Sequence, residues 1–368
     1  MQIQIENKNK MFNLFGGKKN RFLGIDLGTS AVKIVELTLR GKKVHLENYG
    51  WADFDFFVKN NNNFQSYEER IKMYLKKLTE KMKVKPKTAY VSIPGFIGLI
   101  SLIDFPNMSR EEIDKAINFE AHKYVPASLK DVSVAWDIVD KKENLSTEGD
   151  ESRIQVLLVV VPKKEVIRCE NIVKYSGLGI KAMELETFSI ARSLVGDDMG
   201  NFLIIDIGSR ACNIILVEKG IVKVNRNIDS GGNEITSAIA ESMNISPERA
   251  EMLKKQGKDF INSKESMIIF PALEIISSEA TRVVSAYKDK IGNVKIDAVI
   301  LSGGTAKLKG IDTYFSKALN IKTIIGDPWK KIEVDEKILP TVRTLGTSFS
   351  AAIGLALKGV EEYKNKKS

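Results

Sequence analysis

Two short motifs carry the residues best suited to chemistry. The first has the sequence DLGTS over residues 26–30, and the second has DIGS over residues 206–209. Each motif lies between two apolar runs rich in β-branched residues, which predicts a tight turn between two buried strands. The matching aspartates, Asp26 and Asp206, are 180 residues apart. One such motif occurs readily by chance, but two in the same context predict two lobes built on related sheets.

Both turns are suited to binding a phosphate group. Gly28 and Gly208 have no side chain to hold a ligand away, so the N–H groups of the turn can converge on an anion. A carboxylate beside a phosphate would repel it, so we expect Asp26 and Asp206 to hold Mg²⁺ through its water molecules. The hydroxyl and ammonium donors nearby are Thr29, Ser30, Ser209 and Lys33.

A third glycine pair occurs later in the chain. Gly303 and Gly304, with Thr305 after them, lie between an apolar run at 298–301 and a predicted helix. Backbone can approach a ligand closely at such a pair, and a helix N-terminus favours an anion or a polar ring. Each motif alone is an ordinary turn, because Asp and Gly are common in turns. Their conjunction favours a nucleotide.

The elements that must position these residues alternate between strand and helix in both halves, which indicates an α/β architecture. In the first half we expect strands at 22–27, 32–37, 44–53 and 88–93 and a helix at 66–83. A module at 96–178 has expected strands at 97–103, 132–139 and 154–161 and helices at 109–124 and 163–175. In the second half we expect helices at 232–243, 246–256 and 271–288. Residues 361–368 are charged and have no apolar face.

This order of motifs resembles the superfamily of actin, hexokinase and chaperone ATPases, which carry phosphate-one, phosphate-two and adenosine motifs in the same order. Within it, the chain resembles the PilM family of actin-like cytoplasmic proteins of type IV pilus assembly, and next the cell-division family FtsA. The segments that carry the resemblance are Met11–Phe15, Gly24–Lys33, Phe105–Glu112, Glu120–Pro126 and Gly354–Lys358.

The resemblance implies a bilobal actin-like ATPase fold with two related sheet lobes and an inserted small α+β domain of the FtsA type. The leader 1–20 would be flexible, and the tail 359–368 charged. The first lobe (1A) would cover 21–95 and 179–200, and the inserted domain (1C) 96–178. The second lobe (2A) would cover 201–230 and 296–358, with its last helix returning towards the first lobe, and subdomain 2B would cover 231–295.

The resemblance also implies that ATP or ADP binds with Mg²⁺, and that Lys33 reaches the phosphates. The matching residues are Asp26, Gly28, Thr29, Ser30 and Lys33 for phosphate-one; Asp206, Gly208 and Ser209 for phosphate-two; Gly231 and Gly232 at a helix lining the nucleotide cleft; Glu251 and Lys254 at the ribose; and Gly303, Gly304 and Thr305 along the adenine and ribose. From the residues alone, Glu251 and Lys254 are only an exposed charged pair.

One departure from relatives bears on hydrolysis. Residues 210–212 read Arg-Ala-Cys, where relatives commonly keep hydroxyl residues around the γ-phosphate. Glu186 matches the position of a water-orienting residue and is the one catalytic candidate, although a glutamate at a helix start also interacts favourably with the helix dipole. We therefore expect ATP to bind with slow or absent hydrolysis and to act as a clamp, through its differential affinity for the closed form of the lobes.

Composition excludes several classes of protein. Among 368 residues, 56 Lys and Arg against 47 Asp and Glu give a net charge of +9, spread too thinly to indicate a nucleic-acid partner. Cys169, Cys212, His45 and His122 offer neither a disulfide framework nor a metal site, and we expect them to be structural. No apolar run approaches the roughly 20 residues of a membrane-spanning helix.

The resemblance implies a partner as well. The inserted domain and first lobe would bind the N-terminal cytoplasmic peptide of a PilN-like inner-membrane protein, alongside other pilus assembly proteins including the assembly ATPase. The protein would be cytoplasmic and peripheral at the inner face of the cell membrane, attached indirectly through this partner. Residues 11–15 could also contact a membrane surface weakly, although a disordered leader is the simpler interpretation.

Two alternatives remain open at this point. An FtsA-like membrane tether in cell division would end in an amphipathic helix, and residues 358–368 show no sustained apolar face. A small-molecule kinase of the same superfamily would need a substrate-binding insertion with a catalytic aspartate, and none is obvious in the sequence.

Overall fold

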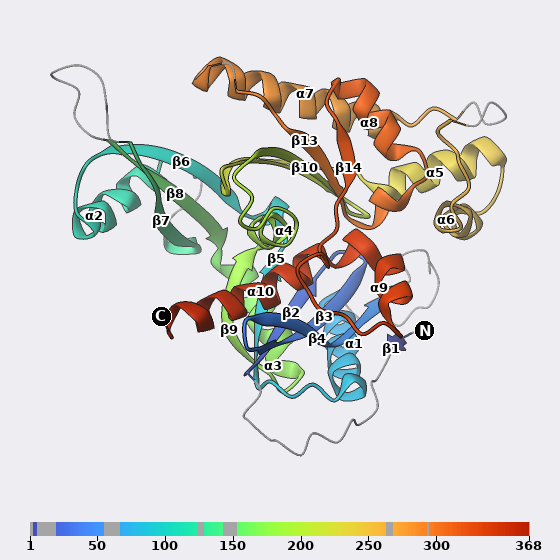
Figure 1. Ribbon diagram of the computed structural model, residues 1–368, viewed down its shortest axis with the longest axis horizontal. Coiled ribbons are helices and arrows are strands. Elements are labelled where there is room, and N and C mark those ends of the chain that lie inside the picture. The colour runs from blue at the N-terminus through green and yellow to red at the C-terminus, as the bar shows by residue number, and fades with distance from the viewer. Residues whose placement is uncertain are drawn as a thin grey trace.

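The structure, a computed structural model, describes residues 3–5, 20–54, 67–123, 129–142, 153–262, 268–292 and 294–367. Its strands form three sheets of six, five and three strands. In Figure 1 the six-stranded sheet lies in the lower lobe and the five-stranded sheet in the upper lobe, while the three-stranded sheet projects to one side. The predicted α/β, bilobal fold with an inserted small module is confirmed.

The first lobe is built on the six-stranded sheet. Its strands are β1 (Ile3–Ile5), β2 (Asn20–Leu27), β3 (Ala31–Arg40), β4 (Lys43–Asp53), β5 (Thr88–Ile93) and β9 (Gly179–Leu185), in the order β1-β4-β3-β2-β5-β9. Helices α1 (Tyr67–Met82) and α3 (Lys163–Tyr175) pack on one face and α10 (Ser350–Asn365) on the other. Because both faces are covered, β2 and β3 are buried along most of their length.

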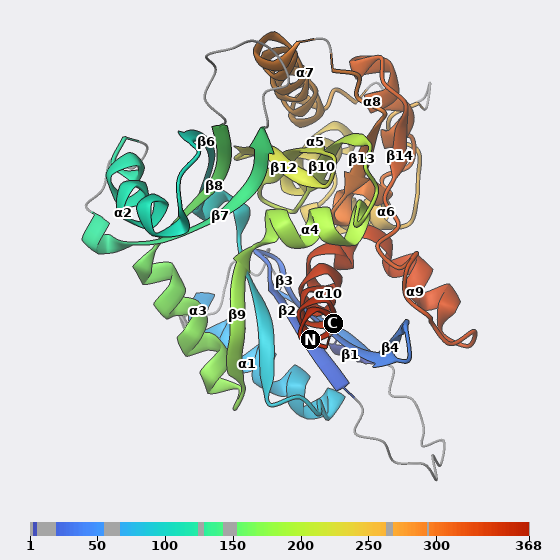
Figure 2. The same cartoon turned by 60° about the vertical axis from the view of Figure 1, so that its left-hand side comes forward.

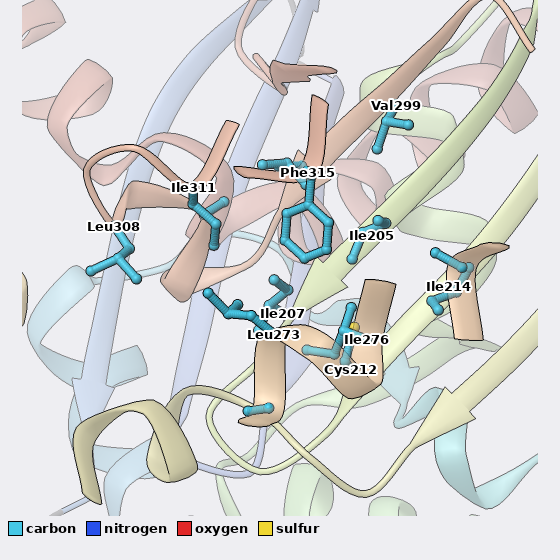
Figure 3. Close-up of a cluster of buried hydrophobic side chains, with 14 of the residues drawn as sticks. Ile205, Ile207, Cys212, Ile214, Leu273, Ile276, Val299, Leu308, Ile311 and Phe315 are labelled. Atoms are coloured by element: carbon cyan, nitrogen blue, oxygen red, sulfur yellow. The ribbon is translucent and has the colours of Figure 1, made fainter. Parts of the chain in front are cut away.

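The second lobe is built on the five-stranded sheet. Its strands are β10 (Asn201–Ile207), β11 (Cys212–Glu218), β12 (Ile221–Ile228), β13 (Ala298–Ser302) and β14 (Thr323–Ile325), in the order β12-β11-β10-β13-β14. One face is covered by α5 (Gly232–Met243), α6 (Pro247–Lys255), α7 (Pro271–Ile291) and α8 (Ile311–Leu319). Figure 3 shows this core, where Ile205 and Ile214 of the sheet lie among helix side chains such as Ile276 and Phe315. The other face packs on α4 (Glu186–Leu194).

The two large sheets repeat one arrangement. Apart from β1, each sheet begins along the chain with three antiparallel neighbours (β2, β3, β4 and β10, β11, β12), and two parallel strands follow (β5, β9 and β13, β14). The predicted relation between the two halves of the chain is therefore confirmed at the level of topology.

The inserted module has its own small sheet and core. Strands β6 (Leu99–Pro106), β8 (Arg153–Pro162) and β7 (Val132–Lys142) are antiparallel in that order, and α2 (Arg110–Ala121) packs on them. A capping box starts α2, because Ser109 and Glu112 each accept a hydrogen bond from the other's backbone N–H. The first strand begins at Leu99 rather than at Ile97, since residues 95–97 form a 3₁₀ turn.

Helices α4 and α10 cross between the lobes, as Figure 2 shows. They approach closely at Gly354, where a Cβ would overlap the carbonyl oxygen of Ser189. Helix α9 (Leu339–Leu345) leads into α10 through a short 3₁₀ turn. No helix of the described part of the chain is long and apolar enough to cross a membrane.

The structure corrects the predictions for both ends of the chain. Residues 359–365 are not a tail but the last turns of α10, in which Val360 is 2 % exposed and Tyr363 packs against Phe22. The charged residues of this segment made its apolar face hard to recognise in the sequence. Glu361 forms an ion pair with Arg192, and this pairing allows a charged residue to lie against the first lobe. At the other end, residues 3–5 of the expected flexible leader pair with β4.

Some predictions fall wholly or partly outside the described residues: the segment 11–15 and the end of the segment 120–126. After Gly303 the structure also differs from the prediction. Only a 3₁₀ turn (Gly304–Lys307) follows, and the α-helix begins at Ile311.

Candidate functional site

The two predicted turns meet where the lobes join. The hydroxyl oxygens of Thr29, after β2, and Ser209, after β10, are 3.1 Å apart and share a hydrogen bond. Both turns follow strands that have a parallel neighbour, and ligands of α/β proteins bind at such carboxyl ends. Two motifs 180 residues apart in the sequence are thus adjacent in space.

In the first lobe, Asp26 lies at the centre of a buried polar group. Its side chain accepts hydrogen bonds from Lys33 Nζ at 3.2 Å and from Ser92 Oγ at 3.0 Å, and the residue is 4 % exposed. Burial by itself would lower the pKa of Lys33, but the carboxylates of Asp26, and less strongly Asp206 and Asp53, raise it overall. Lys33 is therefore a firmly protonated cation facing both lobes.

The second lobe repeats this arrangement with one change. Asp206 pairs in register with Asn213 of β11, as Asp26 pairs with Lys33 of β3, and Ser302 of β13 lies beside it. Burial raises the pKa of Asp206 to about 6, although Ser302 and the charge of Lys33 act in the opposite direction. The second lobe has the amide of Asn213 at the position where the first lobe has the ammonium group of Lys33. The residue paired with Asp206 on the neighbouring strand is therefore not a cation.

Glu186, the catalytic candidate, begins α4 next to these carboxylates. Its Oε1 accepts hydrogen bonds from the backbone N–H of Gly95 at 2.9 Å and from Asn213 Nδ2 at 2.7 Å. Burial, followed by the negative charges of Asp26 and Asp206, raises the pKa of Glu186 to about 7. A carboxyl poised near neutral pH can exchange a proton with a nearby water molecule.

The start of α5 is packed directly onto the second turn. The N–H of Gly232 donates to the carbonyl of Gly208 at 2.9 Å, and a Cβ on Gly232 would lie 2.5 Å from Thr305 Oγ1. The N–H of Gly231 donates to the Glu234 carboxylate at 2.8 Å. These glycines are needed because the backbone of the second turn and the Thr305 side chain lie too close to leave room for Cβ atoms.

Glu251 and Lys254 are not the exposed pair that the residues alone indicated. The Lys254 side chain is 10 % exposed, and its ammonium donates to the Gly232 carbonyl at 2.9 Å and to Thr236 Oγ1 at 2.6 Å. Glu251 pairs with Lys254 at 2.6 Å. The two residues therefore hold the first turn of α5 in place beside the site.

The third glycine pair closes the second-lobe side. Gly303 has φ +86°, and a Cβ there would overlap the backbone of Ile207 at the end of β10. The neighbouring Gly304 is exposed, with nothing nearer to its missing Cβ than Ser348 Oγ at 3.9 Å. On the first-lobe side, the Ser30 carbonyl accepts a hydrogen bond from the N–H of Phe54, which places the end of β4 next to the first turn.

Sequence reasoning missed three residues of this site: Ser92, Asn213 and Lys307. Asn213 could have been found from the internal repeat, because it follows Asp206 by the same seven positions that separate Lys33 from Asp26. Lys307 carried no local signal. Desolvation, followed by the charges of Lys33 and Lys255, lowers the pKa of Lys307 to about 8. Because Lys307 interacts with Lys33, it is a further cation near the site.

The residues fit a nucleotide with a water-coordinated cation better than a protein-ligated metal. Among the described residues, no three His, Cys, Asp or Glu side chains are grouped to ligate a metal ion. A Mg²⁺ ion on a nucleotide needs only one or two carboxylates besides phosphates and water, and Asp26 and Asp206 would supply these.

Comparison with known families decides the relationship. The sequence matches the family described as type IV pilus assembly protein PilM over residues 24–360. The chain belongs to the PilM family. A solved structure of a PilM-PilN type IV pilus biogenesis complex agrees in fold with this PilM-family chain at a TM-score of 0.76 and 21 % identity, over 92 % of this chain and 98 % of that one.

Other known proteins are similar to this PilM-family protein in fold or in sequence. MreB 5 of Spiroplasma citri bound to AMPPNP aligns at a TM-score of 0.50 and 15 % identity, over 94 % of this chain and 98 % of that one. The cell division protein FtsA of Enterococcus faecalis is 20 % identical over 338 residues, which is 80 % of this chain and 76 % of FtsA. The predicted resemblance to the PilM family and to actin-like proteins is confirmed.

Proposed function

We propose that this PilM-family protein is a scaffold of type IV pilus assembly that binds ATP or ADP with Mg²⁺ where its two lobes meet. The observation that carries the proposal is the 3.1 Å hydrogen bond between Thr29 and Ser209. A phosphate chain bound at these turns would contact both lobes at once. Its affinity would then be greatest for the closed arrangement, which it would stabilise.

The charges of the site support this assignment. Asp206 and Glu186 have raised pKa values, chiefly because burial disfavours their ionised forms, and a cation bound nearby would favour those forms. When bound, Mg²⁺ would supply that positive charge and neutralise the phosphates. Lys33 would reach the phosphates from the first lobe, while the turn N–H groups beside Gly28 and Gly208 would orient the phosphate oxygens.

Slow or absent hydrolysis is part of the proposal. Positioning an attacking water needs polar groups near the terminal phosphate. Residues after Ser209 offer few: the Arg210 guanidinium points to Asp229 at 3.5 Å, the Ala211 carbonyl accepts from Gly208, and the Cys212 thiol is buried in the second-lobe core. Glu186 remains the residue that would orient water, and it does so best when ionised.

The partner follows from the family. We propose that the inserted module and first lobe bind the N-terminal cytoplasmic peptide of a PilN-like inner-membrane protein, as the name of the PilM-PilN complex indicates for that relative. The module offers exposed apolar side chains for such a peptide, including Phe96, Leu99 and Phe119. Binding would place the protein at the inner face of the membrane, where it would meet other assembly proteins such as the assembly ATPase.

Nucleotide binding is tested by Asp26→Ala and Asp206→Ala. We expect each substitution to remove most of the rise in melting temperature that Mg-ATP gives the wild-type protein, because each removes a carboxylate that holds the cation. Asp289→Ala, on the exposed face of α7, is the matched control and should respond to Mg-ATP like the wild type. Undiminished stabilisation of both site variants by Mg-ATP would contradict the proposal.

Partner binding is tested by calorimetry with a synthetic peptide copying the N-terminal cytoplasmic segment of PilN from the same organism. We expect saturable binding that Phe96→Ala weakens about tenfold or more, since an exposed aromatic side chain at an interface is a common anchor. Ile275→Ala, on the exposed face of α7 in the second lobe, should leave binding unchanged. Absence of heat at high micromolar peptide would refute the assignment.

A further inference from the structure

One face of β12 is polar and contacts three segments outside its own sheet. Asn225 and Asn227 alternate along this edge strand and therefore project to the same side, and Lys223 lies two residues earlier, at the bulge between Val222 and Val224. Lys223 Nζ donates to Gln155 Oε1 at 2.7 Å, Asn225 Oδ1 accepts from Thr187 Oγ1 at 3.1 Å, and Asn227 Nδ2 donates to the Gly95 carbonyl at 3.1 Å. We call these three residues the β12 polar face; Figure 2 shows β12 between α4 and the module.

At one end, the β12 polar face reaches the candidate nucleotide site. Asn227 pairs in register with Asn213 of β11, whose amide donates to Glu186. Gly95 accepts from Asn227 through its carbonyl and donates to Glu186 through its N–H. The position of the Glu186 carboxyl is therefore set jointly by the second-lobe sheet and by the segment that leads into the module.

At the other end, the β12 polar face reaches into the module. Gln155 lies on the central strand β8 and is 8 % exposed. Its Nε2 donates to Asp104 Oδ1 on β6 at 3.1 Å, while its Oε1 accepts from Lys223. A side chain of the second lobe thus completes the hydrogen bonding of an amide that is buried in the module.

These contacts depend on the position of the lobes. Hydrogen bonds weaken steeply when distance or angle changes, whereas apolar contacts tolerate sliding. Two amide oxygens of the network, Asn213 Oδ1 and Asn227 Oδ1, are buried with no hydrogen-bond partner among the described residues. A buried unpaired acceptor is costly, so a rearrangement that pairs them is favoured once the lobes move.

We propose that the β12 polar face couples the nucleotide site to the inserted module, so that nucleotide and partner peptide change each other's affinity. This inference rests on the proposed function. A nucleotide that brings the second lobe closer to the first moves β12. The hydrogen bond from Lys223 to Gln155 then either shifts Gln155, at the base of the module, or breaks. By linkage, the peptide changes nucleotide affinity by the same factor.

The test measures the dissociation constant of the synthetic PilN peptide on the full chain, with and without Mg-AMPPNP. We expect about a fivefold or larger change in the wild type. Lys223→Met keeps the aliphatic stem but removes the donor, and should bring that ratio to within about twofold of unity. In the Lys223→Met variant, the affinity for the peptide without nucleotide and the thermal stabilisation by Mg-AMPPNP should differ little from those of the wild type. Lys322→Met, exposed on the same lobe, should keep the wild-type ratio.

The outcomes separate this inference from the proposed function. If the wild type binds both ligands but the peptide dissociation constant is the same with and without nucleotide, the coupling is wrong and the function stands. If Lys223→Met retains the full wild-type ratio, the β12 polar face is not the route and the inference is also overturned. If the wild type binds neither ligand, both proposals fail.

Discussion

At the scale of residues, the site is a small set of charges held in low-polarity surroundings. Three carboxyl groups, from Asp26, Asp206 and Glu186, interact electrostatically with one another, and Lys33 lies near two of them, Asp26 and Asp206. Burial, followed by the repulsion between these carboxyl groups, raises the pKa values of Glu186 and Asp206 to about 7 and 6. A bound cation would favour the ionised forms, so we expect magnesium and nucleotide to bind together.

Glu186→Gln tests the raised pKa. A carboxyl with pKa about 7 in the folded protein, against an ordinary 4.5, binds its proton more tightly when folded, so its contribution to stability is complete below pH 4.5 and is lost as pH rises through 7. Gln stays neutral and still accepts from Gly95 and Asn213. We expect urea denaturation to show the variant about 1 to 3 kcal/mol more stable than wild type at pH 8, with little difference at pH 4.5.

The control for this measurement is Glu241→Gln, an exposed glutamate near the end of α5. Its stability should follow the wild-type pH dependence. If Glu186→Gln and wild type lose stability in parallel between pH 4.5 and pH 8, the carboxyl of Glu186 is not held protonated by its surroundings.

At the scale of elements, the crossing of α4 and α10 holds the lobes at their present spacing. Helix α10 packs on the first-lobe sheet, and α4 packs on the second-lobe sheet. The ion pairs of Arg192 with Glu184 and Glu361 tie α4 to β9 and to the last turns of α10. Closing or opening the lobes must therefore move this pair of helices, which have almost no space between them at Gly354.

Gly354→Ala tests that crossing. The added methyl group would overlap the backbone carbonyl of Ser189, which cannot rotate away as a side chain could. We expect the free energy of unfolding, measured by chemical denaturation, to fall by about 3 kcal/mol. Gly179→Ala on β9 is the matched control, because its Cβ would make an ordinary 3.4 Å contact with Thr88. Equal stability of the two variants would mean that the helices separate freely.

At the scale of the whole molecule, the two lobes present equivalent turns to one shared point. A ligand that bound to one turn alone would affect only that lobe, whereas a ligand that binds to both turns changes the separation of the two lobes. Because the inserted module contacts the second lobe through Lys223 and is joined to the first through Gly95, it responds to that separation.

Hydrogen exchange tests closure directly. With saturating Mg-ATP, we expect slower exchange of backbone amides in both turns, residues 27–31 and 207–212, because one ligand covers the two together. The end of α7, residues 288–291, lies outside the site and should exchange at an unchanged rate. Protection confined to a single turn would show that the nucleotide does not bridge the lobes.

The sequence by itself determined the features that depend on neighbouring residues. Apolar runs rich in β-branched residues and Gly-containing turns predicted the two motif hairpins, because strands and turns are formed by local backbone preferences. The internal repeat also predicted two related sheets. The α/β architecture and the two motif turns were accessible in this way, whereas Glu186, Glu251 and Lys254 entered the candidate site only through the resemblance to a family.

Only the tertiary structure decided which side chains are buried and which face each other. From the sequence, Lys254 would be an exposed charge, but the packing of α6 on α5 buries it. The last turns of α10 have the composition of a charged tail, but Val360 is buried against the first lobe. The role of Asn213 is seen only where it lies beside Gly95 and donates to Glu186. These outcomes depend on contacts between residues far apart in the chain, whose burial and charge pairing no local pattern encodes.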